Sequence, residues 1–134
     1  MEFTIATTAL TTIIEHAAAT APNEACGIVV GTATAIAAAL PARNVAACPA
    51  MSFEIDPQAL IDAQRAARRD GAEVVGWYHS HPNGVATPSP TDAMRAVGDD
   101  RLWLIAAAGH VFAWRAGADG AVHGRFTPIT LVAA

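Results

Sequence analysis

Short apolar segments recur along this chain of 134 residues, and most of them are bounded by glycine, proline or a turn sequence. Runs of roughly four to eight such residues are typical of buried or half-buried β-strands. The segments of this kind are 2–6, 26–30, 32–40, 51–55, 73–81, 101–108, 110–115 and 122–132. We expect a hairpin around Gly31-Thr32, between the second and third segments, and a break in the last segment near Pro128.

Three further segments are expected to form helices, because a residue that can cap a helix stands at or just before the start of each. They are 7–20, 57–70 and 90–97. Thr7 or Thr8 would cap the first helix, Asp56 the second and Ser89 the third. Proline occupies the first helical position of the second and third helices, where its missing N–H group does no harm. Because these helices do not alternate regularly with the strands, the sequence predicts an α+β (mixed α/β) fold around one curved sheet.

Length and charge narrow the class of protein. Chains of this length usually form a single domain. The formal net charge of −4 argues against a nucleic-acid-binding protein, which usually presents a basic surface. The nearest approach to a basic patch is Arg65, Arg68 and Arg69 on the second predicted helix. We interpret these arginines as a solvated helix face, with a docking site for an acidic partner as the alternative.

The sequence also lacks the signals of a membrane or secreted protein. The longest uncharged stretch, 25–42, is interrupted by glycines, threonines and a proline, and it predicts two strands rather than a membrane span. The first residues have no basic region ahead of an apolar run, so we expect no signal peptide. Cys26 and Cys48 are too few for a disulfide framework. We therefore expect a cytoplasmic protein that contacts neither membrane nor nucleic acid. Its oligomeric state stays open, and a homodimer is one candidate.

A candidate metal site lies at the end of the segment 73–81. His79 and His81 are two residues apart on a predicted strand, so their imidazoles lie on one face and Ser80 points to the other. Such a pair alone also occurs without a metal. Asp92 follows ten residues after His81, beyond a loop that can fold back. Two imidazoles and one carboxylate would leave a tetrahedral Zn²⁺ with an open position for water, as in catalytic sites. Asp92 could equally stabilise the N-terminus of a helix, where a negative charge is favourable, and the two roles are compatible.

Two polar residues are candidates for the remaining catalytic work. Glu24 directly precedes the apolar run 25–30, and it could take a proton from an activated water and pass it to a leaving amine. It could also be an ordinary loop carboxylate. Ser89 could donate a hydrogen bond to a carbonyl oxygen that becomes anionic. Its simpler role is to cap the helix that begins at Pro90.

The spacing of these residues resembles the motif of the JAMM (MPN-domain) metalloproteases, E…H-S/T-H-P-x6-S-x2-D. The matching residues are Glu24, His79-Ser80-His81-Pro82, Ser89 and Asp92. The segments 22–27, 53–57 and 76–78 are also similar to the family, so that the resemblance covers nearly the whole chain. None of the five catalytic positions departs from the motif, which makes the non-catalytic MPN scaffolds a poor match.

The resemblance implies a single JAMM/MPN-like domain over residues 1–134, with a curved, mainly antiparallel sheet flanked by helices. It implies that His79, His81 and Asp92 bind zinc, that Glu24 is the general acid/base and that Ser89 assists the oxyanion. It further implies hydrolysis of the amide or isopeptide bond after the C-terminal Gly-Gly of a ubiquitin-like or sulfur-carrier protein. The alternatives are a non-catalytic module that binds a ubiquitin-like partner and another zinc-dependent hydrolase that cleaves small peptides.

Other zinc hydrolases fit less well. Zinc deaminases require H-x-E and P-C-x-x-C, and neither sequence occurs. Amidohydrolases with H-x-H need about 250 residues to close their barrel. Asn83 stands where a metallo-β-lactamase-like site would have an acidic residue. We expect a structural role for Cys26, and the sequence does not indicate whether the loop 83–87 closes the site. We expect His16, His110 and His123 to be surface or core histidines rather than ligands. Trp77, Trp103 and Trp114 fall on predicted strands and are expected in the core.

Overall fold

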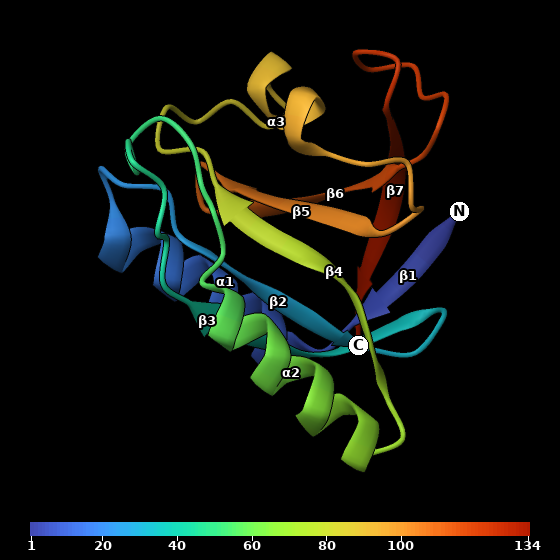
Figure 1. The fold of residues 1–134 in the computed structure, drawn as a ribbon. Coiled ribbons are helices and arrows are strands. Elements are labelled where there is room, and N and C mark those ends of the chain that lie inside the picture. The colour runs from blue at the N-terminus through green and yellow to red at the C-terminus, as the bar shows by residue number, and fades with distance from the viewer.

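Seven strands of the computed structural model, which describes residues 1–134, form one sheet that closes on itself in the order β1-β3-β2-β4-β5-β6-β7 (Figure 1). The strands are β1 (Glu2–Ile5), β2 (Cys26–Gly31), β3 (Ala35–Ala42), β4 (Glu73–Ser80), β5 (Leu102–Ala107), β6 (His110–Ala116) and β7 (Phe126–Ala133). The helices are α1 (Thr7–Thr20), α2 (Pro57–Arg69) and α3 (Pro90–Arg95). No helix is both long enough and apolar enough to span a bilayer.

The sheet confirms the predicted mixed α+β fold and the hairpin of β2 and β3. Four of its seven pairings are antiparallel, namely β2 with β3 and β4, and β6 with β5 and β7. The other three are parallel, and two of these join β1 to β3 and β7. The first strand thus fills the gap between two distant parts of the chain and turns the expected curved sheet into a closed one.

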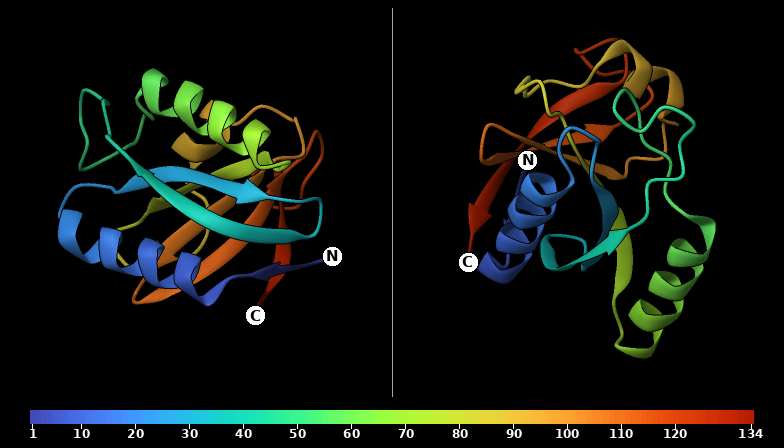
Figure 2. Two further views of the ribbon diagram at one scale, coloured as in Figure 1. Left: turned by 90° about the horizontal axis from the view of Figure 1, so that it is seen from below. Right: turned by 90° about the vertical axis from the view of Figure 1, so that its left-hand side faces the viewer.

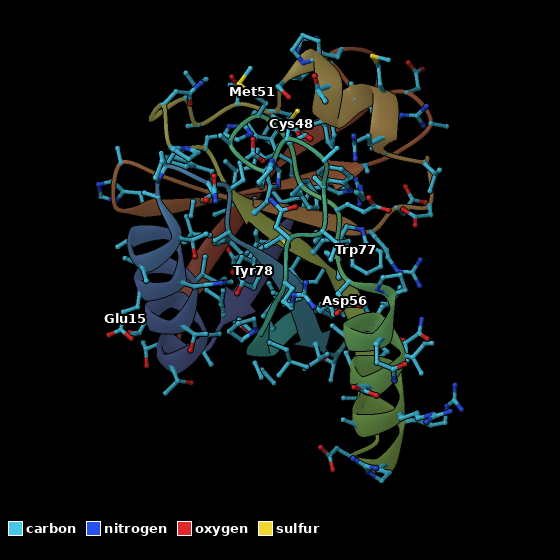
Figure 3. The ribbon with its side chains drawn as sticks, turned by 60° about the vertical axis from the view of Figure 1, so that its left-hand side comes forward. Glu15, Cys48, Met51, Asp56, Trp77 and Tyr78 are labelled. Carbon is cyan, nitrogen blue, oxygen red and sulfur yellow. The ribbon has the colours of Figure 1, made fainter.

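The two longer helices lie on either side of the β2–β3 hairpin (Figure 2). α1 packs on the larger core cluster, to which it contributes Ala9 and Ile13. On the other side of β4, Phe53, Trp103 and Phe126 belong to a second cluster. Neighbouring side chains of β4 therefore pack in different clusters. Tyr78 belongs to the larger cluster and Trp77 packs against the second, on opposite sides of the strand (Figure 3). Because the side chains alternate in this way, the end of β4, where the functional residues lie, borders the second cluster.

Two predicted helix starts are confirmed and one is wrong. Asp56 caps α2 by accepting a hydrogen bond from the N–H of Gln58, and Ser89 caps α3. Neither Thr7 nor Thr8 caps α1, because its N-cap is Ala6, which makes no side-chain bond. β1 runs directly into this helix, and the N–H of Thr7 donates instead to the carbonyl of Ala134 at 3.4 Å. A tertiary contact thus replaces the local cap.

Two strand predictions are corrected as well. Residues 51–55 form no strand and make only a single bridge between Ile55 and Asn44. The side chain of Asn44 bonds to the main chain of Ser52 and Glu54, so a side chain takes the place of a partner strand for these two residues. The expected break near Pro128 is also absent, since this residue lies within β7 opposite Trp114. Pro128 precedes the pairing with β1, which begins at Thr130, so it has no β1 partner there.

Candidate active site

The two histidines of the predicted metal site come together at the end of β4. His79 is completely buried, and His81 lies one residue beyond the strand, where its N–H donates to the carbonyl of Ala106. Their Nε2 atoms are 3.1 Å apart, and the rings meet edge to face. Ser80 points away from them and accepts a hydrogen bond from the N–H of Ala25 at 2.8 Å. The expected alternation along the strand is thus confirmed.

Asp92 joins the pair because of the way α3 begins. Ser89 and Asp92 form a capping box, in which the Oγ of Ser89 accepts from the N–H of Asp92 and the Oδ2 of Asp92 accepts from the N–H of Ser89 at 2.9 Å. The same Oδ2 lies 3.2 Å from the Nε2 of His79 and 3.1 Å from the Nε2 of His81. Asp92 therefore holds the helix start and completes a group of three possible ligands, which are the two roles expected from the sequence.

The geometry of this group fits a metal ion. The Nδ1 of His81 lies 2.7 Å from the carbonyl oxygen of Val85, which can only accept, so Nδ1 carries the proton of the neutral ring. In this neutral form its Nε2 has no proton and can offer a lone pair to a metal ion placed between it, His79 and Asp92. Ligands of a tetrahedral zinc ion with bonds of about 2.0–2.1 Å lie about 3.3 Å apart. Separations of 3.1–3.2 Å between these atoms match that arrangement.

The surroundings favour the protonation states that metal ligands need at His79 and Asp92, whereas in the metal-free chain they favour a proton on His81. Complete burial lowers the pKa of His79 and so favours the neutral imidazole. Burial alone would raise the pKa of Asp92, but hydrogen bonds from both histidines and from the N–H of Ser89 outweigh it and lower that pKa well below its usual range. Burial also acts to lower the pKa of His81, but its hydrogen bonds to Asp92 and to the Val85 carbonyl leave it raised.

Glu24 lies in the connection between α1 and β2 and is only 7% exposed. Its main chain is fixed at both ends, because its N–H donates to the carbonyl of Pro49 at 2.8 Å and its carbonyl accepts from the Nδ2 of Asn44 at 3.0 Å. The buried Oε1 has no hydrogen-bond partner in the chain. Burial first, and then the charge of Asp92, raise the pKa of Glu24 to about 7 against the opposing charges of His81 and Arg95.

Asn44 is a residue that the sequence interpretation missed. Its Nδ2 donates to the carbonyls of Glu24 and Ser52, both at 3.0 Å, and its Oδ1 accepts from the N–H groups of Ala46 and Glu54. One side chain therefore joins Glu24 to the whole segment 44–54. Asn44 is not followed by a helix or strand, and no local pattern in a single sequence marks such an asparagine as structurally important. Only the separate pieces of chain that it connects reveal its importance.

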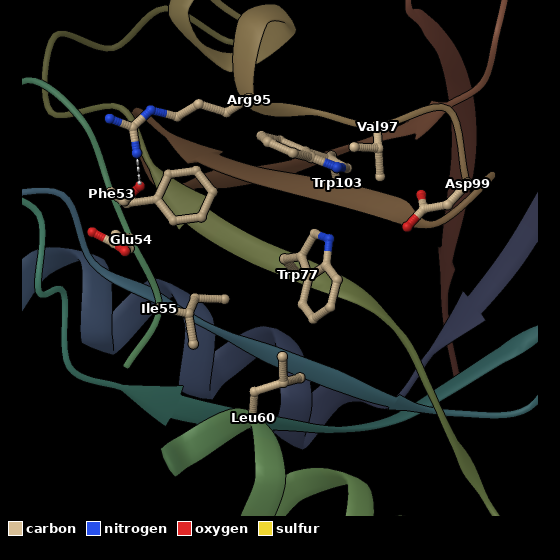
Figure 4. A pocket seen from close by; sticks show the side chains of 9 residues that line it. All are labelled: Phe53, Glu54, Ile55, Leu60, Trp77, Arg95, Val97, Asp99 and Trp103. Atoms are coloured by element: carbon tan, nitrogen blue, oxygen red, sulfur yellow. Dashed lines mark hydrogen bonds between the residues drawn. The ribbon is translucent and has the colours of Figure 1, made fainter. Parts of the chain in front are cut away.

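The segment 44–54 also supplies an aromatic wall. Phe53 stacks on His79 with ring centroids 4.3 Å apart and planes at 19°, and the edge of Trp103 meets His79 from another direction. Arg95 of α3 donates to the carbonyl of Phe53 at 3.1 Å. These contacts fix the ring plane of His79, and beside them lies an apolar cavity of about 360 Å³ (Figure 4). Its lining residues are Phe53, Glu54, Ile55, Leu60, Trp77, Arg95, Val97, Asp99 and Trp103.

A second, more polar cleft of about 510 Å³ opens directly over the candidate site. Glu24, His81 and Ser89 line it together, so the structure brings these predicted residues into one space. Met51 from the segment 44–54 lies at its rim and is 77% exposed (Figure 3). The Oγ of Ser89 uses a lone pair to cap α3, and its proton has no acceptor in the chain. The cap and a role as donor are therefore compatible.

Cys26 and the other histidines do not line the cleft, with one exception. Cys26 is buried opposite His79 on β2, and burial raises the pKa of its thiol to about 12, as suits a structural residue. His16 is hydrogen-bonded to the buried Tyr78 at 2.7 Å, and His110 is exposed at the start of β6. Trp103 is a core residue, as expected. His123 is the exception, because it lines the cleft and contacts Pro88.

Residues 7–117 match the family described as prokaryotic homologs of the JAB domain. The chain is 40% identical over 93 residues to a desampylase of Haloferax volcanii, a match that spans 68% of this chain and 67% of that protein. It is 37% identical over 81 residues to a probable TtuB-protein conjugate cleaving protease of Thermus thermophilus, over 60% of this chain and 54% of that protein.

The fold resembles solved structures over almost its full length. A solution structure from Desulfitobacterium hafniense matches with a TM-score of 0.80 at 24% identity, over 100% of this chain and 94% of the other. A crystal structure of a JAB1/MPN domain protein from Archaeoglobus fulgidus matches with a TM-score of 0.57 at 18% identity, over 97% and 96%. At these identities the likenesses establish the JAB1/MPN fold.

Proposed function

The chain belongs to the prokaryotic homologs of the JAB domain, and we propose that it is a JAMM-type hydrolase that acts as a zinc-dependent isopeptidase. The proposed reaction is hydrolysis of the amide bond after the C-terminal Gly-Gly of a ubiquitin-like or sulfur-carrier protein, by residues 1–134 acting as one domain. The observation that carries the proposal is the convergence of His79, His81 and Asp92 through three atoms 3.1–3.2 Å apart, in contact with the cleft that Glu24 lines.

His79, His81 and Asp92 are the residues that would hold zinc. When bound there, the ion supplies Lewis acidity that lowers the pKa of water toward about 7. The ionised state of Asp92 keeps its oxygen ready as a ligand, and the neutral state of His79 leaves one of its two ring nitrogens without a proton. The Val85 carbonyl holds the ring of His81 in the orientation that its Nε2 requires.

Glu24 is the proposed general acid/base. Its carboxylate accepts the proton of the attacking water and returns it to the nitrogen of the leaving amine, while the scissile C–N bond breaks and a carboxylate forms. Burial raises the pKa of this group to about 7, and a group with such a pKa can both accept and release a proton near neutral pH. Asn44 and Pro49 hold its main chain, so the carboxylate is directed from a fixed backbone.

Ser89 is the proposed donor to the carbonyl oxygen of the substrate. Its hydroxyl proton is free, its oxygen is fixed by the N–H of Asp92 at 3.0 Å, and its side chain lines the cleft with Glu24. A donor that is already oriented stabilises the negative charge of the tetrahedral intermediate without further reorganisation.

The names of the two relatives support a protein conjugate as substrate, since one is a desampylase and the other a protease that cleaves TtuB–protein conjugates. Three prolines, Pro82, Pro88 and Pro90, line the cleft and make its walls rigid. Such a cleft favours substrate residues that have no side chain, which are glycines. A Gly-Gly tail in extended form meets that requirement.

The test uses purified protein with zinc and a panel of ubiquitin-fold carriers, each extended by a short peptide beyond Gly-Gly. Intact mass measurement should show cleavage after the second glycine in at least one carrier. Glu24→Gln should retain the metal and lose roughly 10²–10⁴ in rate, while Glu15→Gln on the exposed face of α1 should cleave like the wild type. Cleavage of unrelated peptides with every carrier left intact would exclude the carrier class.

A further inference from the structure

His123 lies in a turn whose backbone prefers other residues. The N–H of Arg125 donates to the carbonyl of Val122 at 3.0 Å, and the two central residues, His123 and Gly124, have φ of +53° and +67°. Left-handed φ at both central positions is the pattern for which Asn-Gly is strongly preferred. Histidine is therefore not explained by the turn itself, and its side chain needs a separate explanation.

That side chain reaches across to the loop before α3. The Nε2 of His123 donates to the carbonyl oxygen of Pro88 at 3.0 Å, because a carbonyl can only accept. Pro88 and His123 are 35 residues apart in the chain. Both line the cleft that holds Glu24 and Ser89. The contact therefore connects the β6–β7 connection to the wall of the proposed active site.

The bond from His123 is the only hydrogen bond that joins residues 82–88 to a part of the chain outside 79–93. The other bonds of this loop are local: the N–H of Gly84 donates to His81, the N–H of Val85 to Asn83, and the Nδ1 of His81 to Val85. No other hydrogen bond reaches residues 86–88. His123 therefore supplies the one hydrogen bond that restrains this loop from a distant part of the chain.

The bonded carbonyl belongs to the peptide unit that also contains the N–H of Ser89. That N–H donates to the Oδ2 of Asp92, the atom that approaches both histidines. A peptide unit is planar and rigid, so holding its oxygen also fixes the direction of its N–H. One continuous path thus runs from the ring of His123 through the Pro88–Ser89 peptide to Asp92.

We propose that His123 is a positioning residue that fixes the Pro88–Ser89 peptide and thereby orients both the Asp92 carboxylate and the Ser89 hydroxyl. The assignment of these two groups to the reaction rests on the proposed function, whereas the restraint on the loop does not. A hydrogen bond of this kind typically changes an equilibrium by about 2- to 10-fold. We expect effects of that size on kcat and on zinc affinity.

Two substitutions separate this role from the stability of the turn. In His123→Gln the amide nitrogen is as many bonds from Cα as the Nε2 of histidine, so the bond to Pro88 can form again. His123→Asn suits the left-handed turn better, but its amide is one bond shorter. If only the turn matters, Asn will equal or exceed the wild type and Gln will be the weaker variant. If the bond to Pro88 matters, the order is reversed.

Three readouts are measured on the full chain. The first is hydrogen exchange, in the metal-free protein, of the hydrogen-bonded amides of Gly84, Val85 and Ser89. The second is zinc affinity by competition with a chelator, and the third is kcat and KM on a carrier that the wild type cleaves. We expect His123→Asn to exchange faster at these amides and to bind zinc about 2- to 10-fold more weakly. Its kcat should fall by a larger factor than its KM rises. His123→Gln should stay close to the wild type in all three measurements.

The proposal is overturned if His123→Asn matches the wild type in exchange and zinc affinity, or if His123→Gln is as impaired as His123→Asn. Faster exchange with unchanged kcat and zinc affinity also overturns it, since the bond would then hold the loop without orienting the site. Failure of the wild type to cleave any carrier would count against the proposed function, and exchange and zinc affinity would still decide the role of His123.

Discussion

Ser80 and Ala25 are joined by two hydrogen bonds, one from the N–H of Ala25 to the Oγ of Ser80 at 2.8 Å and one from the N–H of Ser80 to the carbonyl of Ala25 at 3.0 Å. Ser80 is the residue between the two candidate histidine ligands, and Ala25 directly follows Glu24. The residue that points away from the metal site therefore fixes the position of the proposed acid/base relative to the imidazoles.

Replacing Ser80 should weaken both stability and activity. Ser80→Ala leaves the N–H of Ala25 without its acceptor in a place where Ala25 is 1% exposed, which costs about 1–3 kcal/mol of unfolding free energy. Ser80→Thr keeps the hydroxyl and is the matched control. Urea unfolding and carrier cleavage should both show the loss in the alanine variant. Equal behaviour of Ser80→Ala and the wild type would remove the proposed link to Glu24.

Loss of a single ligand should release the metal. The purified protein is expected to bind about one zinc ion per chain, and His79→Ala or Asp92→Ala should abolish this binding because only three side chains converge on the site. His110→Ala removes an exposed histidine and serves as the control. Metal content by mass spectrometry after dialysis checks the prediction. A wild-type protein that is active without metal would contradict it.

The metal-free protein should become less stable as pH rises because of Glu24. Its pKa is raised by burial from an ordinary value of 4.5 to about 7, so the folded state binds the proton more tightly than the unfolded state. This contribution to stability is fully present below pH 4.5 and is lost as pH rises to about 7. Glu24→Gln does not titrate, and its unfolding free energy should rise relative to that of the wild type across this interval.

The comparison is made by urea unfolding at several pH values with a chelator present. Glu15→Gln, whose side chain is exposed on α1, controls for the change in net charge. A constant difference between Glu24→Gln and the wild type from pH 4.5 to 7 would show that burial does not disturb this carboxyl group.

The two roles of Ser89 can be separated by choice of substitution. Glycine at an N-cap costs only a few tenths of a kcal/mol relative to serine, whereas alanine costs about 0.5–2 kcal/mol. Ser89→Gly should therefore retain most of the stability but lose roughly 10²–10³ in kcat, because the hydroxyl donor is absent. Ser89→Thr keeps the oxygen and the proton and should restore activity. If Ser89→Gly turns over like the wild type, Ser89 serves only as a cap.

The sequence by itself determined the parts of the site that depend on neighbouring residues. The two-residue period of a strand places His79 and His81 on one face, and the capping box places Asp92 at the start of α3 beside the N–H of Ser89. These relations are set by backbone geometry over a few residues. For the same reason the strand and helix patterns predicted most of the elements and the mixed α+β fold.

The tertiary structure decided everything that requires distant parts of the chain to meet. Closure of the sheet by β1 is such a case, as are the Ala134 contact at the start of α1 and the segment 51–55, whose backbone bonds to the side chain of Asn44 instead of to a strand. Glu24 and His123 reach the cleft in the same way, from connections without local periodicity. The physical reason is that the partners of these groups are chosen by packing across the fold, and sequence spacing carries no record of that choice.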